Sequence, residues 1–310
     1  MIFDNVLQAI GHTPIIRLNR LVSSADAEVL VKFEGVNIGG SIKTRTALHM
    51  LEQAEKQGLI GPDSIIVEPT SGNQGIGLAL VGAVRGYRVI IVMPDSVSEE
   101  RRKLVRQYGA EVRLVEDKGD IGECIANCLA MAERLAAENP QVYIPQQFIN
   151  PHNPDVHRLQ TAREILEQVD KPIDGFCAGI GTGGTISGVG EVLKERYPDI
   201  LIWAVEPQNA AILSGGIIGS HVQMGIGDGL IPQNLNTAIY ADIAVITDEE
   251  ALITARALAR EEGLLAGISS GTNVAAALRM AKKLGYGKTV LTILPDTGER
   301  YFSTPLFNAE

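Results

Sequence analysis

Cysteine is scarce in this sequence, with three among 310 residues. A small, odd number gives no basis for a disulfide framework, so we expect a reducing, cytoplasmic environment. Cys124 and Cys128 lie four positions apart on an expected helix, a spacing that a metal pair could use. No histidine or third cysteine lies near them in the sequence to complete a tetrahedral site. We therefore expect buried free thiols and no metal.

The sequence also lacks an excess of basic residues and has no long apolar run. The chain carries 27 Lys and Arg against 37 Asp and Glu, a formal net charge of −10. This balance argues against nucleic acid or an anionic membrane surface as a partner. No uninterrupted apolar stretch reaches the roughly 18 residues of a membrane helix. Asp4 interrupts the apolar start of the chain, so we expect no signal peptide either.

Glycine, by contrast, is abundant, with 33 residues. The glycines follow no three-residue period, which excludes a collagen-like chain. In a well-mixed sequence with 45% hydrophobic residues, such a surplus indicates tight turns and places where the backbone approaches a ligand closely.

Short runs rich in Val and Ile alternate with helical patterns along the chain. Strands are expected at 65–68, 89–93, 112–115, 174–178, 201–206, 244–247 and 289–294. Helices are expected at 41–57, 73–85, 98–108, 121–138, 155–169, 185–195, 248–262 and 272–284. This alternation is typical of an α/β protein with largely parallel sheets. Pro and Asn cluster at 145–154, which predicts a boundary between two halves with a ligand cleft between them.

Polar, glycine-containing loops precede several of the expected helices, at 37–43, 70–75, 179–185 and 267–271. Each loop offers backbone N–H groups and hydroxyls to an anion at a helix N-terminus. In the third loop, Gly179, Gly181 and Gly184 spell G-x-G-x-x-G, and Glu206 ends the next expected strand. That pattern also fits a dinucleotide site, so an NAD-dependent dehydrogenase is an alternative.

Lys43 stands at the start of an expected helix, beside glycines. A lysine is electrostatically unfavourable at a helix N-terminus. It is either a solvated surface residue or a lysine whose pKa is lowered, so that its neutral amine can form a Schiff base.

Ordered motifs from end to end of the chain resemble those of the cysteine synthase and cystathionine β-synthase family. The motifs are IGHTP (10–14), GSIK (40–43), EPTSGN (68–73), PDSVSEERR (94–102), QFINP (147–151), GTGGT (181–185), GIG (225–227), GISSG (267–271) and GERY (298–301). These are fold-type II enzymes that depend on pyridoxal 5'-phosphate (PLP). The glycine-rich motif at 179–184 is then explained by a phosphate site rather than by NAD.

The resemblance implies a tryptophan synthase β-like fold, in which two three-layer α/β/α domains enclose a cofactor cleft. The smaller, mobile N-terminal domain would comprise residues 35–145. Residues 146–310, with N-terminal strands from 13–34, would form the C-terminal domain that carries the phosphate site. The resemblance also implies a homodimer.

The resemblance assigns roles to individual residues in binding PLP. Lys43 is expected to hold PLP as an internal aldimine and then to remove the substrate Cα proton. Asn73 is expected to hydrogen-bond the phenolic oxygen. Ser269 is expected to face the pyridine nitrogen, with Ser270 as the less favoured candidate. A phosphate cup is expected from backbone N–H groups and threonine hydroxyls of Gly181, Thr182, Gly183, Gly184 and Thr185.

The substrate is expected beside this cofactor site. Its binding residues, most of them in the carboxylate loop at 70–75, would be Thr70, Ser71, Gly72, Asn73, Gln74, Gln147 and Gly225. A neutral serine at the ring nitrogen limits carbanion build-up and favours loss of a β-substituent. The implied reaction is β-replacement through an α-aminoacrylate intermediate, with O-acetyl-L-serine and sulfide giving L-cysteine and acetate.

The sequence departs from the family pattern at Thr44, where Asp is usual, at Gln74, where Thr is usual, and at Asp228, where a small or aromatic residue is usual. Asp228 either points outward without a role or points into the cleft, where it could take a proton from water. In the second case L-cysteine and water would give L-serine and hydrogen sulfide, with Asp228 as general base. Cystathionine β-synthase, serine dehydratase and a non-enzymatic binding protein are less favoured alternatives.

Overall fold

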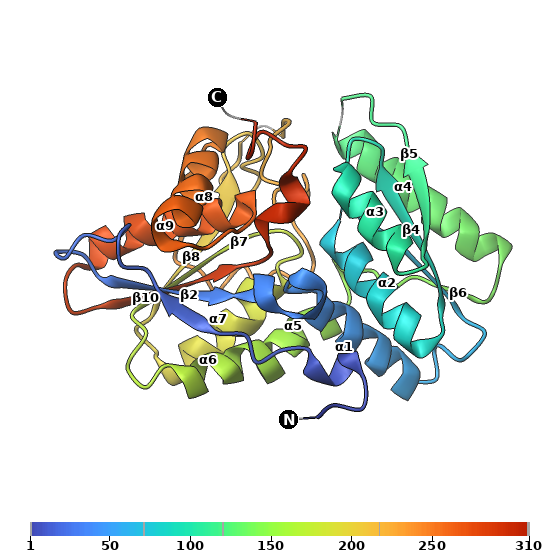
Figure 1. The fold of residues 1–310 in the computed structure, drawn as a ribbon, viewed down its shortest axis with the longest axis horizontal. Coiled ribbons are helices and arrows are strands. Elements are labelled where there is room, and N and C mark those ends of the chain that lie inside the picture. Colours follow the sequence, from blue (N-terminus) through green and yellow to red (C-terminus); the bar gives the residue numbers. More distant parts are fainter. Residues whose placement is uncertain (1, 71, 120, 217, 309–310) are drawn as a thin grey trace.

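Two β-sheets form the framework of the protein (Figure 1). The computed structural model describes residues 2–70, 72–119, 121–216 and 218–308. Within these residues, the larger sheet has six strands in the order β1-β2-β10-β7-β8-β9, and the smaller has four in the order β5-β4-β3-β6. All neighbouring strands are parallel except β1 and β2. The expected α/β class with largely parallel sheets is confirmed.

The strands of the larger sheet are β1 (Ile15–Arg17), β2 (Glu28–Phe33), β7 (Gly175–Gly179), β8 (Leu201–Pro207), β9 (Asp242–Ile246) and β10 (Thr289–Leu294). Those of the smaller sheet are β3 (Ile65–Pro69), β4 (Arg88–Pro94), β5 (Glu111–Val115) and β6 (Val142–Tyr143). The short strand β6 was not expected, because two residues carry too little periodicity to read.

The α-helices are α1 (Lys43–Lys56), α2 (Asn73–Arg85), α3 (Glu99–Gln107), α4 (Ile121–Glu138), α5 (His152–Val156), α6 (Ala162–Gln168), α7 (Gly184–Arg196), α8 (Asp248–Glu262) and α9 (Ile268–Leu284). Short helical turns are η1 (Val6–Ala9), η2 (Glu34–Val36), η3 (Ile38–Gly40) and η5 (Gly298–Tyr301), with a π-helical turn η4 (His157–Thr161). No helix in the described part of the chain is both long and apolar enough to cross a membrane.

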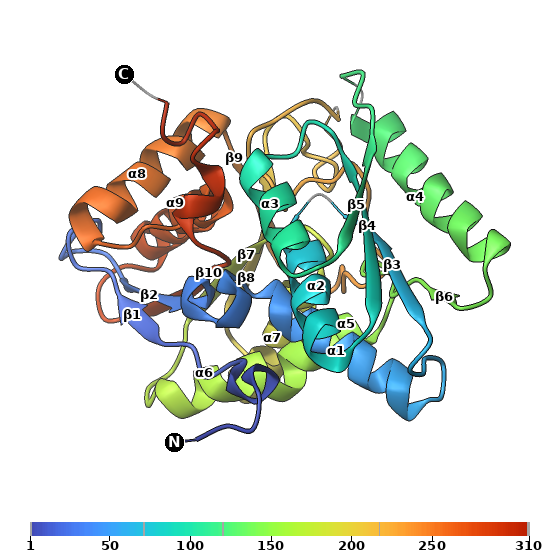
Figure 2. The same ribbon diagram turned by 45° about the vertical axis from the view of Figure 1, so that its right-hand side comes forward.

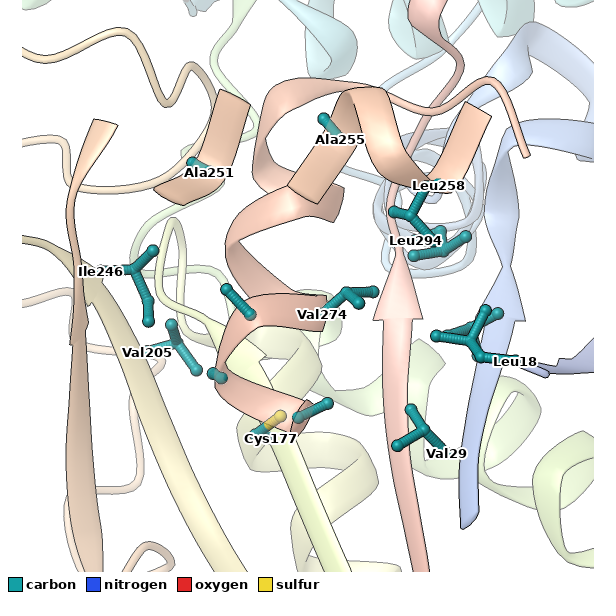
Figure 3. Packing of buried hydrophobic residues seen from close by; sticks show 14 of the residues in the cluster. Leu18, Val29, Cys177, Val205, Ile246, Ala251, Ala255, Leu258, Val274 and Leu294 are labelled. Carbon is teal, nitrogen blue, oxygen red and sulfur yellow. The ribbon is translucent and has the colours of Figure 1, made fainter. Parts of the chain in front are cut away.

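Each sheet is covered on both faces, because successive strand residues point to opposite sides. In the larger sheet, Cys177 packs toward α8 and α9, whereas its neighbours Phe176 and Ala178 pack toward α6 and α7. Figure 3 shows the first of these clusters, in which Val205 and Ile246 lie beneath the two helices. In the smaller sheet, alternate residues pack toward α1 and α2 on one face and toward α4 on the other.

Helix α1 joins the two halves, since it packs against α2 and against α5 (Figure 2). The smaller sheet with α1–α4 uses residues 43–143, and the larger sheet uses 15–33 and 175–294. That residues 35–145 form a mobile domain stays a prediction.

Two of the expected helices begin three or more residues away from where they were expected. The helix expected at 155–169 begins at His152 and is interrupted by η4. The helix expected at 272–284 begins at Ile268, so the residues expected as a loop form its first turn. Gly271 serves helix packing here, because an added Cβ would lie 2.0 Å from the carbonyl oxygen of Ala251 in α8.

Candidate active site

A cavity of about 400 Å³ lies at the carboxyl ends of strands from both sheets, with Pro69, Pro94, Gly179 and Ile293 in its wall. Such strand ends are where open α/β sheets bind ligands. Helices α1, α2, α7 and α9 begin at this wall. Their N-termini carry partial positive charge and free backbone N–H groups, so the cavity is suited to anions.

Lys43 is the first residue of α1 and faces the cavity. Burial lowers the pKa of its amine to about 8, against a weaker opposing effect of Asp228. A buried amine is costly to charge, which makes the neutral, nucleophilic form accessible near neutral pH. Lys43 is therefore not the solvated surface lysine of the alternative interpretation.

Arg45, one helical position beyond Thr44, fixes the start of α1. Its buried guanidinium pairs with Glu34 at 2.9 Å and with Glu164 at 2.6 Å. Lys32 on β2 pairs with the same Glu164, which lies on α6, at 2.7 Å. Burial disfavours the charged guanidinium, but the two carboxylates prevail and raise the pKa of Arg45. The first turn of α1 is thereby tied to β2 and α6, and removing one partner of such a buried network is strongly destabilising.

The expected phosphate cup surrounds the N-terminus of α7. Gly181, Thr182, Gly183 and Thr185 line the cavity. Gly184 lies behind the wall, where an added Cβ would be 2.0 Å from Oδ1 of Asn153. Gly183 has a φ of 77°, which favours glycine, and caps the helix.

The threonine hydroxyls of the cup are oriented by their neighbours. The hydroxyl oxygen of Thr182 accepts a hydrogen bond from Nδ2 of Asn153 at 2.9 Å, which leaves its own proton free to be donated into the cavity. The hydroxyl of Thr185 lies 3.4 Å from Nε2 of His157. Burial holds the pKa of His157 well below its ordinary value, so this ring is neutral.

The two serines at the start of α9 are separated by the structure. Ser269 lines the cavity. Ser270 is fully buried, and among the described residues its hydroxyl has no hydrogen-bond partner. Ser269 is thus the one placed to meet a ligand.

Most residues expected to bind substrate also reach the cavity, namely Thr70, Gly72, Asn73, Gln74, Gln147 and Gly225. Ser71 lies outside the described residues. Asn73 donates to Oδ2 of Asp296 at 2.6 Å and accepts from Arg300 at 2.6 Å. Its second N–H remains for a ligand, because an amide nitrogen carries two protons.

The two departures near α1, Thr44 and Gln74, are both buried, and Gln74 lines the cavity. The amide oxygen of Gln74 accepts from the Thr46 hydroxyl at 2.7 Å, and its buried Nε2 has no partner in the described part of the chain. Thr44 is buried against Gly39, where an added Cβ would lie 2.6 Å from its hydroxyl oxygen. Gln74 therefore has an amide donor to offer.

Asp228 points into the cavity rather than outward. It lines the wall, and one carboxylate oxygen is 3.8 Å from where a Cβ on Gly181 would lie. Burial raises the pKa of Asp228, while the charges of Lys43 and His221 act in the opposite direction. Nε2 of His221 lies 3.0 Å from the Gly227 carbonyl oxygen, and Nδ1 accepts from the Gln223 N–H at 3.1 Å. With both nitrogens engaged, His221 is poorly placed to act as a base.

A further group at the cavity rim was missed by sequence reasoning. Arg101 lines the cavity, is 2% exposed and donates to the Tyr301 hydroxyl at 2.8 Å. Tyr301 in turn donates to Asp296 at 2.7 Å. Arg101 and Tyr301 lie within motifs used for the resemblance, so their presence was visible. Their proximity was not, because it depends on packing between α3 and η5.

The alternative of a dinucleotide site is not supported. Glu206, which would have to bind a ribose, is 2% exposed and accepts from the backbone N–H groups of Leu213 at 2.9 Å and Ser214 at 3.0 Å. Its carboxylate is therefore used within its own loop.

The donor set fits PLP. The cofactor needs an amine for its aldehyde, N–H and hydroxyl donors for its phosphate, and a partner for its ring nitrogen. Lys43 carries an amine, the cup at 181–185 carries N–H groups and threonine hydroxyls, and Ser269 carries a hydroxyl, all on one cavity. Fold and site together define a PLP-dependent α/β enzyme.

Comparison with known proteins agrees with this class. Residues 6–296 match the family described as "Pyridoxal-phosphate dependent enzyme", and the chain belongs to that family. A cysteine synthase from Staphylococcus aureus is 50% identical over 306 residues, which cover 98% of this chain and 97% of that protein.

Solved structures of related enzymes are also similar. An O-ureido-L-serine synthase has 42% identity and a TM-score of 0.93, covering 100% of this chain and 96% of that one. A hydrogen sulfide-producing enzyme from Fusobacterium nucleatum has 41% identity and a TM-score of 0.92, covering 97% of this chain and 100% of that one.

Proposed function

We propose that this enzyme catalyses β-replacement on a three-carbon amino acid, converting O-acetyl-L-serine and sulfide to L-cysteine and acetate. The observation that carries the proposal is the convergence of Lys43, the phosphate cup and Ser269 on one cavity beside the carboxylate loop. The cysteine synthase from Staphylococcus aureus, similar over nearly the whole chain, supports this choice of reaction.

Lys43 has two tasks in this proposal. Its amine binds the cofactor covalently, and it later takes the substrate Cα proton at Nζ. Bound PLP supplies an electron sink at Cα, which permits a substituent on Cβ to leave. The pKa of about 8 suits an amine that must accept and release a proton near neutral pH.

The carboxylate loop and Gln147 hold the substrate α-carboxylate at the N-terminus of α2. The helix dipole and free N–H groups there favour an anion. Ser269 would offer a neutral hydroxyl to the ring nitrogen of bound PLP, which limits charge build-up at Cα and favours β-substituent loss. Asn73 would have its remaining N–H for the phenolic oxygen.

The proposal extends to the assembly and location of the enzyme. We infer a homodimer in which residues 35–145 move as a unit to close the cleft, with the C-terminal domain carrying the phosphate cup. A cytoplasmic location fits the three cysteines, which are all buried and free. Amino acids and sulfide, rather than nucleic acid or membranes, are its expected partners.

Product identification tests the reaction. The PLP-loaded protein is incubated separately with O-acetyl-L-serine and sulfide, with L-cysteine and with L-serine, and products are identified by mass spectrometry. Formation of L-cysteine from the first mixture, lost in Lys43→Ala, is the expected result. No product above that of Lys43→Ala in any mixture would contradict the proposal.

A second candidate reaction converts L-cysteine and water to L-serine and hydrogen sulfide. The position of Asp228 on the same cavity as Lys43 favours it, because the carboxylate can take a proton from water as the oxygen attacks Cβ. The thiol leaves as hydrosulfide, which with the proton that Asp228 takes from water makes up hydrogen sulfide. Lys43 returns its proton to Cα, so the atoms balance. The similarity to the Fusobacterium nucleatum enzyme gives this candidate independent support.

A further inference from the structure

Glu68 is a buried carboxylate that the reaction does not use directly. It lies near the end of β3 and is 1% exposed. Its Oε2 accepts the backbone N–H of Gln146 at 3.0 Å, and its Oε1 accepts that of Gln147 at 2.9 Å. Burial raises the pKa of Glu68 to about 7, while the two N–H groups act in the opposite direction.

The backbone that Glu68 holds has an uncommon conformation. Gln146 has a φ of 57°, in the left-handed region that side-chain-bearing residues rarely adopt. Such a conformation persists only where its surroundings maintain it. The two hydrogen bonds from successive N–H groups to one carboxylate provide such a constraint, since they require both N–H vectors to converge.

The segment fixed in this way carries Gln147, which lines the cavity and whose Nε2 donates to the Pro69 carbonyl oxygen at 3.4 Å. The carbonyl oxygen of Gln147 accepts from Nδ2 of Asn153 and from Nδ2 of Asn234, each at 2.8 Å. The same Asn153 nitrogen donates to Thr182 in the phosphate cup at 2.9 Å. A continuous path of hydrogen bonds therefore runs from Glu68 through the Gln147 backbone to the cup.

We propose that Glu68 is a positioning residue that sets Gln147 for the substrate α-carboxylate and ties it to the phosphate cup. The inference rests on the proposed function of Gln147. A carboxylate suits this place, because each of its two oxygens can accept a hydrogen bond from one of the two backbone N–H groups. An amide would present its NH₂ group to one of the two N–H donors.

The test compares Glu68→Gln with the wild-type holoenzyme. We expect the KM for O-acetyl-L-serine to rise roughly ten- to a hundredfold, as for a displaced substrate-positioning group, with a smaller change in kcat. The dissociation constant of the amino acid, measured from the shift of the cofactor absorbance, should rise in parallel. Val67→Ala is the matched control, since Val67 is buried on the same strand and packs toward α4. It should lower the melting temperature without changing KM.

A double-variant cycle separates positioning from general stability. If Glu68 acts through Gln147, Glu68→Gln combined with Gln147→Ala should have the KM of Gln147→Ala alone. The inference would be overturned if the double variant raised KM by the product of the two single-variant factors. It would also be overturned if the KM of Glu68→Gln equalled that of the wild type. Should Glu68→Gln not fold, Glu68→Asp replaces it in the same cycle, with the same outcomes.

The proposed function itself fails in a different way. If the wild type makes no product, the turnover assay is negative while the absorbance titration still reports amino-acid binding. The ratio of variant to wild-type dissociation constants then tests Glu68 on its own.

Discussion

Lys43 and Asp228 lie on the wall of one cavity, and the charge of each favours the charged form of the other. Burial opposes both charges: it lowers the pKa of the lysine and raises that of the aspartate. The pair therefore balances desolvation against mutual attraction, which is the arrangement expected where protons are moved at a catalytic centre.

Covalent capture of PLP by the apoprotein should depend on pH through this pair. Attack on the cofactor aldehyde requires a neutral amine, so the capture rate should rise with pH and level off above a midpoint of about 8. Asp228→Asn removes the charge that raises the lysine pKa, so its midpoint should lie at lower pH. The gain of cofactor absorbance after mixing measures the rate. A midpoint that stays in place or moves to higher pH would show that the two groups do not interact.

The products of Asp228→Asn distinguish the two candidate reactions. An amide cannot take the proton from water, so serine formation from L-cysteine should fall by about a hundredfold or more. Synthesis of L-cysteine from O-acetyl-L-serine and sulfide needs no such base and should persist. Amino-acid analysis of both mixtures measures this. Serine output at the wild-type level would remove Asp228 from the mechanism.

Substitution of the two serines at the start of α9 should have opposite consequences. Ser269→Ala removes the hydroxyl on the cavity wall and should lower kcat and shift the cofactor absorbance. Ser270→Ala removes a buried hydroxyl that has no partner among the described residues. Activity should then be kept and the free energy of unfolding unchanged or raised by about 1 kcal/mol. Kinetics and denaturant titration of both variants check this, and an equal loss of activity in both would contradict it.

The sequence predicted several elements to the residue, and the structure shows why. Helix α8 begins after Thr247, whose side chain and that of Glu250 form a reciprocal capping box, and ends at Gly263 with a φ of 72°. These signals are local and can be read from neighbouring residues. The start of α9 was missed because the role of Gly271 depends on α8.

The candidate site also has parts that local sequence signals predict and parts that depend on long-range contacts. Lys43, the phosphate cup and the carboxylate loop are recognisable as motifs, because glycines and hydroxyls at helix N-termini mark anion sites. The link from Asn73 to Asp296 and Arg300 joins segments more than two hundred residues apart. No pattern of spacing reveals such contacts, and the same holds for the path from Glu68 to Thr182. The sequence alone also left open which way Asp228 points.

The packing role of Gly271 gives a test of stability. Gly271→Ala places a Cβ 2.0 Å from the Ala251 carbonyl oxygen and 2.7 Å from the Ala255 nitrogen, so α8 and α9 must separate. We expect a loss of about 1–3 kcal/mol in the free energy of unfolding, the usual cost of overpacking. Gly61→Ala is the control, since an added Cβ there meets no atom of the described residues within 4 Å. Equal unfolding midpoints for the two variants in denaturant would show that the contact is unimportant.

The fate of the substrate Cα hydrogen tests the central claim, β-replacement with Lys43 as the base, most directly. O-acetyl-L-serine carrying deuterium at Cα is converted with sulfide in ordinary water, and the deuterium content of the L-cysteine formed is measured by mass spectrometry. If Lys43 takes the Cα proton, deuterium passes to an amine that exchanges with water, and the product should lose label. Full retention of deuterium in L-cysteine would mean that sulfide displaces acetate directly at Cβ, and would contradict the account.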